Sequence, residues 1–392
     1  MFAVAQISNA MATDISHVCI GDCDSDCRVT VDELIVGVNI ALGTAAIKHC
    51  QNMNRNRDAY VTVDELVAAI NSALYGCPSC EATNTPTFTK TPTATKTHTP
   101  TGTPTPTFVP EPNCLLAAAL GPFAPGQSDQ NTLSREQVHQ YVDLVPSVAY
   151  GVRFFGTTNG LEHGPCYAKE IGLSSFVGVF VNDDPEIVAN QLAGLRGVAK
   201  CADVVVVGSN AKTYQGVSIE QLLDYACEAK SIVQEEGSNA LVTIGERWDV
   251  YLSEQHLIKS SGCVDIVFGY SHPFYDADAP NVSEAVDRVV NAYNHLDGAY
   301  NMPVYIGETG WPGAPEHDIQ SQGLDPRASL ENQRLFYQMV LNRPELSGKV
   351  VGYQTNDEEW LCGFEKHLCK FGYYYSNLAP KWQVQEALLC NP

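Results

Sequence analysis

The stretch of sequence that decides the fold reads Val304-Tyr305-Ile306-Gly307-Glu308-Thr309-Gly310-Trp311-Pro312. Its first residues form a short apolar run with β-branched and aromatic side chains, which predicts a buried strand. A carboxylate follows the run directly, and Gly and Pro then end the strand. Because loops that follow parallel strands carry the chemistry of such folds, Glu308 stands where a functional carboxylate is expected.

Eight such runs, this one included, alternate with amphipathic stretches from residue 114 to the end of the chain. They are Leu115–Phe123, Tyr150–Phe155, Ser175–Val181, Asp203–Gly208, Ala240–Gly245, Val264–Ser271, Pro303–Gly307 and Val350–Thr355. Helix-start signals such as Ser134-x-x-Gln137 and Ser218-x-x-Gln221 lie between them. Eight strand–helix units over roughly 270 residues predict a (β/α)8 barrel. An open doubly wound sheet is the competing fold, but no Gly-x-Gly-x-x-Gly follows the first run.

Charged and aromatic residues gather just past the ends of the predicted strands. Arg153 lies at the end of the second run, Glu246 follows the fifth, and His272 and Tyr275 follow the sixth. The last two runs are followed by Glu308, Trp311, Asp357, Glu358 and Trp360. This mixture suits a sugar, whose C–H faces stack on aromatic rings and whose hydroxyls bond to charged groups. The mouth of the barrel is therefore predicted to bind a polysaccharide.

The stretch around Glu308 also resembles the nucleophile strand of family 17 glycoside hydrolases, the β-1,3-glucanases and glucan transglycosylases. Further matching motifs are Gly121-Pro122-Phe123, Val152-Arg153-Phe154, Val204–Gly208, Glu246-x-Trp248, Asp357-Glu358-x-Trp360, Gly372-Tyr373-Tyr374 and Pro380-Lys381-Trp382. The resemblance implies that Glu308 attacks the anomeric carbon of a β-1,3-glucan with retention of configuration and no cofactor. Retaining glycosidases use two carboxyl groups roughly 5 Å apart, one as nucleophile and one as proton donor.

The second carboxylate of that pair is missing from its expected place. The family's acid is the Glu of a Val-Gly-Asn-Glu motif, and the equivalent stretch ends in Asn210, whose amide cannot donate a proton to a glycosidic oxygen. Three interpretations follow. Glu246 serves as the acid instead, or the barrel has lost hydrolysis and keeps glucan binding, or position 210 has been altered.

The sequence allows two roles for some of the remaining rim residues and one for others. Arg153 either orients Glu308 or pairs with a structural carboxylate. Tyr275, Trp311 and Trp360 are predicted as sugar platforms, with packing in the core as the alternative. Asp357 and Glu358 are predicted to contact substrate, whereas a lone His272 is more typical of a structural group than of a catalyst. 

The first 80 residues contain a repeat, Val-Thr-Val-Asp-Glu-Leu, at 29–34 and 61–66. Each copy ends a loop with oxygen-bearing residues at the spacing of an EF-hand calcium site. The predicted ligands are Asp22, Asp24, Asp26, Arg28, Thr30 and Glu33 in the first loop, and Asn54, Asn56, Asp58, Tyr60, Thr62 and Glu65 in the second. Cys27 replaces the usual turn Gly, and the second loop has fewer charges, so calcium-free turns held by disulfides are the alternative.

Paired loops followed by a Thr/Pro-rich stretch and a glycosidase barrel resemble the dockerin modules of bacterial polysaccharide-degrading enzymes, which attach to cohesin partners. A general all-α EF-hand module fits the spacing at least as well, so the cohesin partner stays open. The expected domains are a residual signal or tail at 1–18, the calcium module at 19–80, a disordered linker at 81–113 and the barrel at 114–392.

Composition excludes several partners and favours a location outside the cytoplasm. With 23 Lys+Arg against 45 Asp+Glu, the net charge of −22 repels nucleic acids and anionic lipids. No apolar run approaches the roughly 20 residues that span a bilayer. Fourteen cysteines are too many for a reducing compartment, so disulfides and a secreted or cell-surface protein are predicted. Ala10-Met11-Ala12 fits a signal cleavage site, although Met1–Ala5 is short and uncharged.

Overall fold

A computed structural model describes residues 19–23, 29–42, 45–54, 60–75 and 114–382. These residues belong to two compact units, Met1–Thr101 and Gly102–Pro392. The predicted tail at 1–18 and the predicted linker at 81–113 lie outside the described residues.

The described part of the first unit is built from helices. Its elements are α1 Val31–Ala41, η1 Ile47–His49, η2 Gln51–Met53 and α2 Val63–Tyr75. A small core joins α1 and α2, formed by Ile40, Cys50, Met53, Val61 and Ala69. Thr30 and Glu33 form a capping box at the start of α1, as expected for a Thr followed three residues later by Glu.

The second unit contains a parallel sheet of nine strands that is nearly closed into a barrel. The strands are β1 Ala117–Leu120, β2 Gly151–Phe154, β3 Ser174–Val179, β4 Val204–Val207, β5 Leu241–Ile244, β6 Glu246–Arg247, β7 Val267–Tyr270, β8 Val304–Thr309 and β9 Val350–Gly352. Their order is β5-β4-β3-β2-β1-β9-β8-β7-β6. Each of the eight predicted runs contains one strand or most of one, and β6 is an additional two-residue strand. The barrel prediction is thus confirmed at the level of an α/β barrel-like fold.

The two edges of the sheet, β5 and β6, are separated in sequence only by Gly245. A hydrogen bond from Asp265 N to Val242 O, 2.8 Å long, links β5 to the segment before β7. A Cβ atom at Gly245 would lie 2.0 Å from the hydroxyl oxygen of Tyr270, so only glycine lets β5 and β7 approach this closely.

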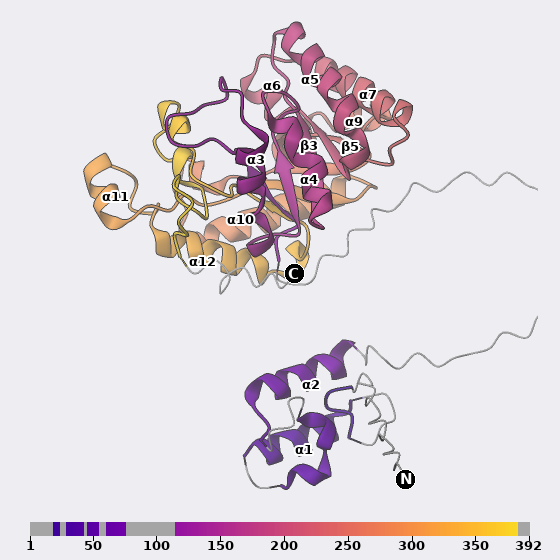
Figure 1. The fold of residues 1–392 in the computed structure, drawn as a ribbon, viewed down its shortest axis with the longest axis vertical. Coiled ribbons are helices and arrows are strands. Elements are labelled where there is room, and N and C mark those ends of the chain that lie inside the picture. The colour runs from indigo at the N-terminus through magenta and orange to yellow at the C-terminus, as the bar shows by residue number, and fades with distance from the viewer. Residues whose placement is uncertain (1–18, 24–28, 43–44, 55–59, 76–113, 383–392) are drawn as a thin grey trace, which may run out of the picture. The chain divides into compact units, whose positions relative to one another are not determined.

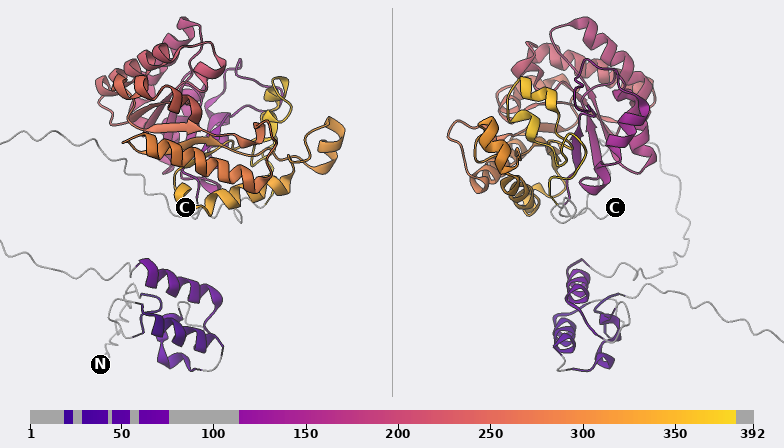
Figure 2. Two further views of the ribbon diagram at one scale, coloured as in Figure 1. Left: turned by 180° about the vertical axis from the view of Figure 1, so that it is seen from behind. Right: turned by 60° about the vertical axis from the view of Figure 1, so that its left-hand side comes forward.

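Helices cover the outer face of the sheet, as Figures 1 and 2 show for α3, α4, α5, α7 and α10. The helices are α3 Arg135–Val142, α4 Gly164–Glu170, α5 Pro185–Val198, α6 Ala211–Tyr214, α7 Ile219–Glu235, α8 Trp248–Ser253, α9 Gln255–Ser261, α10 Val282–Ala299, α11 Glu316–Gln322 and α12 Leu330–Leu341. Short 3-10 helices are η3 Val145–Ser147, η4 Leu161–His163, η5 Ala199–Cys201, η6 Pro273–Tyr275, η7 Pro344–Leu346, η8 Glu359–Gly363 and η9 Leu368–Lys370. The predicted start signals are present as a capping box at Ser218 and a side-chain cap at Ser134, and Asn281 forms a further capping box at the start of α10.

Two large cores and a small cluster of Ala119, Tyr353 and Phe371 hold this unit together. The larger core lies between the strands and the helices. The smaller one fills the barrel interior, with Phe176, Val204, Val206, Phe268 and Tyr270 among its members. A filled interior means that no channel runs through the barrel, so any binding site must lie at an end of the strands.

Four disulfides join described cysteines: Cys23–Cys50, Cys166–Cys201, Cys227–Cys263 and Cys362–Cys369. No free cysteine occurs among the described residues. This many cross-links suggests a protein of an oxidising, extracellular environment, as the cysteine count predicted. Among the described helices, none combines the length and apolar character needed to cross a membrane.

Candidate active site

Glu308 lies at the carboxyl end of β8 and pairs with Arg153, which comes from the end of β2. Arg153 Nη1 donates to Glu308 Oε1, and only 1% and 4% of the two side chains are exposed. Arg153 Nη2 also donates to the hydroxyl of Tyr270, over 2.5 Å. The guanidinium packs over the ring of Phe155, 4.4 Å from its centre. Of the two readings of Arg153, the structure therefore places it against Glu308.

His272 contacts the other oxygen of Glu308. Its Nε2 lies 3.4 Å from Glu308 Oε2, and 21% of its side chain is exposed. The backbone of the adjacent Ser271 donates to Glu308 O over 2.9 Å, which joins the end of β7 to β8. The sequence predicted a structural role for His272, because a lone His after an apolar strand is typical of such a group. Its partner lies 36 residues away on the neighbouring strand, so the sequence gives no sign of this contact.

Asn210 lies in the loop after β4, on the residue that precedes α6. Its backbone has φ 54° and ψ 38°, in the left-handed region that Asn adopts more readily than most residues. The side-chain oxygen Oδ1 is buried and has no hydrogen-bond partner among the described residues. Position 210 thus holds an amide, whose oxygen has no partner among the described residues, where the family resemblance predicts an acid.

Glu246, the predicted substitute acid, is fully buried and is bound by α6. Its Oε1 accepts from Lys212 N over 2.5 Å, and its Oε2 accepts from Thr213 Oγ1 over 2.9 Å. Burial raises the pKa of Glu246, and the bonds to α6 oppose that rise. Both carboxylate oxygens of Glu246 are thus directed at the backbone and side chain of α6. This geometry favours a cap of α6 over a proton donor.

Trp311 does not offer its ring to the mouth, so the prediction of a sugar platform there is wrong. The residue is fully buried and stacks on Phe336 of α12, with ring centres 5.6 Å apart. Its Nε1 donates to Arg327 O over 2.8 Å. The chain turns after β8 and directs this ring into the core, where its one polar group is satisfied.

Glu358 and Trp360 lie together in the loop after β9. Trp360 Nε1 donates to Glu358 Oε2 over 2.8 Å, and Glu358 is only 3% exposed. Its carboxyl packs against the backbone of Gly121, where a Cβ would lie 2.1 Å from Oε1. Burial raises the pKa of Glu358 to about 8, so the group holds a proton at neutral pH. Trp360 is partly exposed and lies edge-on to Phe123 of the loop after β1.

Tyr275 keeps the features expected of a sugar platform. It is 44% exposed, its hydroxyl donates to Glu365 Oε2 over 2.9 Å, and its ring stacks on Phe371 with centres 5.9 Å apart. Phe371 therefore covers one face of the Tyr275 ring and Glu365 fixes its orientation. A ring that is already fixed loses less entropy when a sugar binds to it.

Asp357 is bound within the protein by a buried ion pair. Lys381 Nζ donates to Asp357 Oδ1 over 2.7 Å, and Gly372 N donates to the same oxygen over 2.9 Å. Burial raises the pKa of Asp357 to about 6, against the effect of Lys381. The contact with substrate that the sequence predicted for Asp357 is therefore restricted to the side that borders a pocket.

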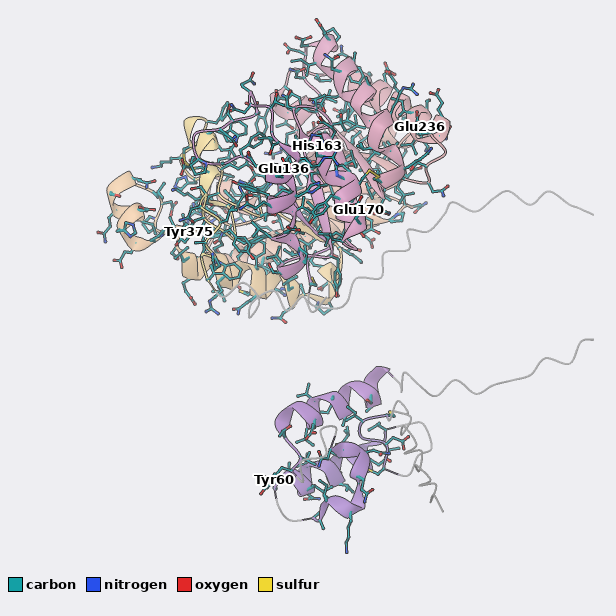
Figure 3. The ribbon with its side chains drawn as sticks, viewed as in Figure 1. Tyr60, Glu136, His163, Glu170, Glu236 and Tyr375 are labelled. Atoms are coloured by element: carbon teal, nitrogen blue, oxygen red, sulfur yellow. A yellow bond between two sulfur atoms is a disulfide. The ribbon has the colours of Figure 1, made fainter. Side chains whose placement is uncertain are left out.

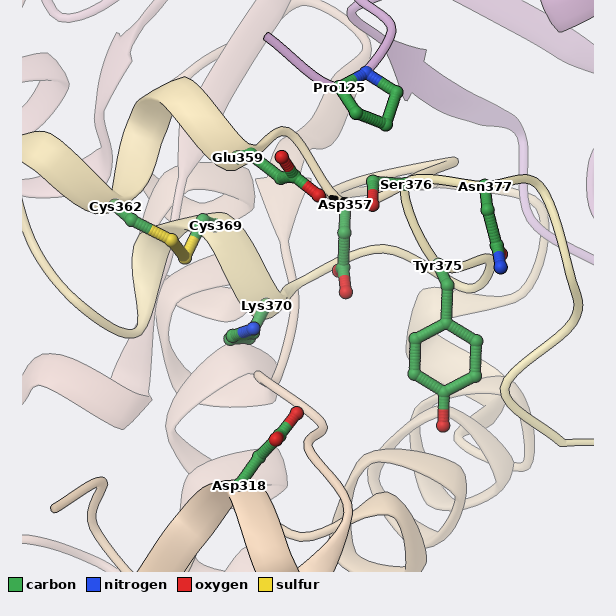
Figure 4. Close-up of a pocket in the computed structure, with 10 residues that line it drawn as sticks. All are labelled: Pro125, Asp318, Asp357, Glu359, Cys362, Cys369, Lys370, Tyr375, Ser376 and Asn377. Carbon is green, nitrogen blue, oxygen red and sulfur yellow. Dashed lines mark hydrogen bonds between the residues drawn. A yellow bond between two sulfur atoms is a disulfide. The ribbon is translucent and has the colours of Figure 1, made fainter. Parts of the chain in front are cut away.

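That pocket has a volume of about 410 Å³ and is shown in Figure 4. It is lined by Pro125, Asp318, Asp357, Glu359, Cys362, Cys369, Lys370, Tyr375, Ser376 and Asn377. In the close-up, the carboxylates of Asp318 and Asp357 point toward the same space from opposite sides. Tyr375, labelled in Figure 3, lies on the side of the barrel where α11 stands. The lining is mostly polar, with one aromatic ring.

The predicted calcium loops are only partly described. Asp24, Asp26, Arg28, Asn56 and Asp58 lie outside the described residues, so calcium binding stays a prediction. Glu33 is described: its Oε1 accepts from Cys23 N and its Oε2 from Thr30 N, both over 2.7 Å. Asp22, Asn54 and Glu65 are buried, whereas Thr30 and Tyr60 are exposed. Thr62 N donates to Glu65 Oε2 over 2.9 Å.

A family profile matches more than half of the chain. The profile of the BtgE/BtgC glycoside hydrolase domain matches residues 121–367. The matched segment includes Arg153, His272 and Glu308, which meet at the mouth of the barrel.

The individual relatives of known sequence share less than 30% identity with this chain. "Probable beta-glucosidase btgE" of Aspergillus flavus is 29% identical over 199 residues, which are 49% of this chain and 32% of that protein. The protein of the same name from Aspergillus clavatus is 25% identical over 246 residues, or 61% of this chain and 42% of that protein. The chain thus spans less than half the length of these relatives. Among solved structures, the exo-beta-1,4-mannosidase Op5Man5 from Opitutaceae bacterium strain TAV5 superposes with a TM-score of 0.51 at 11% identity, covering 71% of this chain and 59% of that one. This likeness concerns the fold alone.

Proposed function

Because the chain belongs to the BtgE/BtgC glycoside hydrolase domain family, we propose that its barrel cleaves β-glucan, with Glu308 as the nucleophile of a retaining reaction. The single observation that carries this proposal is the buried pair between Arg153 and Glu308 at the strand ends. A nucleophile needs a fixed position, and a charge-assisted hydrogen bond from a guanidinium supplies it. The β-1,3 linkage rests on the sequence resemblance of the strand that carries Glu308.

The proposed reaction lacks an efficient proton donor. Asn210 cannot protonate the leaving oxygen, and the carboxylate of Glu246 is bound to α6. General acid catalysis typically contributes about 10² to 10⁴ in rate. We therefore propose slow turnover of glycosides with poor leaving groups. When the leaving group needs no proton, the glycosyl-enzyme forms at a normal rate, but its hydrolysis stays slow because the missing acid would also serve as the general base of that second step.

The same observation at Asn210 supports a second candidate function. A barrel without its acid retains the mouth and its aromatic rings, so it can bind glucan without cleaving it. In that case Glu308 accepts a hydrogen bond from a sugar hydroxyl, and the protein attaches to a glucan surface.

We further propose that Tyr275, Trp360 and Glu358 contact the sugar nearest Glu308. The pocket beside Asp357 would hold another sugar unit of the same glucan, because Tyr375 offers an aromatic ring and the other residues that line the pocket offer hydrogen bonds. Export from the cell, calcium in the loops at 22–33 and 54–65, and a cohesin-type partner remain proposals that rest on the sequence.

One experiment separates cleavage from binding. The full chain is incubated with 2,4-dinitrophenyl β-glucoside, whose leaving group needs no proton, and with laminarin-type oligosaccharides. Release of dinitrophenol that Glu308→Gln abolishes, together with slow cleavage of the oligosaccharides, supports the enzyme. Binding of the oligosaccharides with no release from either substrate supports the glucan-binding protein instead. A Glu228→Gln variant, changed at an exposed position of the outer helix α7, serves as the control for handling and folding.

A further inference from the structure

The two oxygens of Glu308 are not equivalent. Arg153 Nη1 bonds to Oε1, and this guanidinium is itself held by Tyr270 and Phe155, so Oε1 is fixed within the protein. Among the described residues, Oε2 has only the longer contact of 3.4 Å with His272 Nε2. The oxygen that reacts must leave its hydrogen bonds at little cost, and Oε2 meets that condition better than Oε1.

His272 occupies a fixed orientation beside Oε2. Its ring lies edge-on to Tyr353, with centres 5.5 Å apart, and edge-on to Phe371, with centres 6.1 Å apart. These two aromatic contacts hold the ring plane, so Nε2 is directed at Oε2 by packing as well as by hydrogen bonding.

The tautomer of His272 follows from its surroundings. Nδ1 is buried and has no hydrogen-bond partner among the described residues. A hydrogen on Nδ1 would therefore be buried without an acceptor, whereas a hydrogen on Nε2 faces a carboxylate oxygen. The ring is consequently assigned as an Nε2–H donor to Glu308, in a contact that is still long for a hydrogen bond. Catalytic hydrogen bonds are often long without substrate and shorten when it binds.

We propose that Oε2 of Glu308 is the attacking oxygen and that His272 is the positioning residue that aims it. This inference rests on the proposed role of Glu308 as nucleophile and adds the residue and the atom. In the step itself, a lone pair of Oε2 forms the bond to the anomeric carbon. The bond from that carbon to the leaving group breaks, and the leaving group takes the electron pair. No proton has to move when the leaving group is a stable anion.

Two substitutions separate aiming from packing. His272→Phe keeps a ring of similar size against Tyr353 and Phe371 but removes the N–H. His272→Gln loses the ring but keeps an N–H at about the same reach. If His272 positions Glu308, the Gln variant should react faster at Glu308 than the Phe variant. If His272 only packs against its neighbours, the Phe variant should react faster.

The test uses the full chain and 2-deoxy-2-fluoro-β-glucosyl fluoride, which traps a retaining nucleophile with loss of fluoride. The gain of one fluorosugar on the peptide that contains Glu308 is followed by mass spectrometry, and thermal unfolding is measured in parallel. At saturating reagent, His272→Phe should label about 10- to 100-fold more slowly than the unchanged protein with little change in unfolding temperature. His272→Gln should stay within about tenfold of the unchanged rate.

Equal labelling rates for His272→Phe and the unchanged protein would overturn the role of His272 and leave the nucleophile in place. Slower labelling of both variants that follows their loss of thermal stability would overturn it as well. If the unchanged protein takes up no fluorosugar at all, the proposed function fails together with this inference. Labelling that persists in Glu308→Gln leads to that same conclusion.

Discussion

Asn210 and Gly245 are joined by a backbone hydrogen bond of 2.9 Å, from Asn210 N to Gly245 O. This bond ties the loop after β4 to the end of β5 and holds Asn210 in its left-handed conformation. An acid introduced at this position would therefore start from a backbone that is already fixed, although it is one that Glu tolerates less well than Asn.

Replacing Asn210 with Glu should restore the proton donor. We expect the steady-state rate on laminarin-type oligosaccharides to rise about 10²-fold or more. With 2,4-dinitrophenyl β-glucoside, the first-turnover burst of dinitrophenol should not gain comparably, because that step needs no acid, whereas its steady-state release should rise because the carboxylate introduced at position 210 would act as base in the second step. Because the residue stays left-handed, the free energy of unfolding should fall by roughly 1 kcal/mol. Steady-state rates and urea unfolding measure the two effects. Asn210→Gln is the matched control, because Gln has the size and the backbone strain of Glu at this position but cannot transfer a proton to the leaving oxygen. A rate gain in that variant would contradict the explanation.

Changing Glu246 to Gln should affect stability more than chemistry. The amide has one accepting oxygen instead of two, so Lys212 N and Thr213 Oγ1 cannot both keep a charged acceptor, and the Thr213 hydroxyl must turn to accept from the amide. We expect a loss of about 1–3 kcal/mol in the free energy of unfolding and activity within about threefold of the unchanged protein. An activity loss of two orders of magnitude in a well-folded variant would show that Glu246 is the acid after all.

The buried carboxyl of Glu358 should make stability depend on pH. Its pKa is raised from an ordinary 4.5 to about 8, because burial disfavours the charged form. The protonated group therefore stabilises the folded state fully below pH 4.5, and this contribution is lost as the pH rises through 8. Glu358→Gln should flatten this dependence and unfold at a higher temperature than the unchanged protein above pH 8. Thermal unfolding between pH 5 and 9 tests this, with the exposed neighbour in Glu359→Gln as control; parallel curves for both variants would contradict it.

The sequence predicts the barrel well because each strand is a short apolar run. It misses β6, since Glu246-Arg247 carries no apolar signal and pairs with β7 only when the barrel is nearly closed. The site is predicted less completely. Positions just past a strand end are evident from sequence, but the direction of each side chain depends on how the loop turns afterwards. Trp311 therefore turns into the core, Glu246 turns to α6, and His272 meets a partner on another strand.

The buried ion pair between Lys381 and Asp357 should contribute strongly to the free energy of unfolding. Lys381 Nζ also donates to Gly313 O and Lys370 O, so the ammonium joins three loops near the pocket. Lys381→Met removes this cation and leaves the Asp357 carboxyl buried without its counter-charge. We expect a loss of about 3–5 kcal/mol in the free energy of unfolding, measured with urea.

The double variant Lys381→Met with Asp357→Asn should recover part of that loss, because no uncompensated charge remains in the protein interior. Recovery is expected to be incomplete, since the carbonyls of Gly313 and Lys370 still lack the ammonium donor. A single variant that loses less than about 1 kcal/mol would mean that water reaches Asp357 and replaces Lys381. The double variant would then show no recovery, and the loop after β9 would owe its position to the Cys362–Cys369 disulfide and the contacts of Phe371.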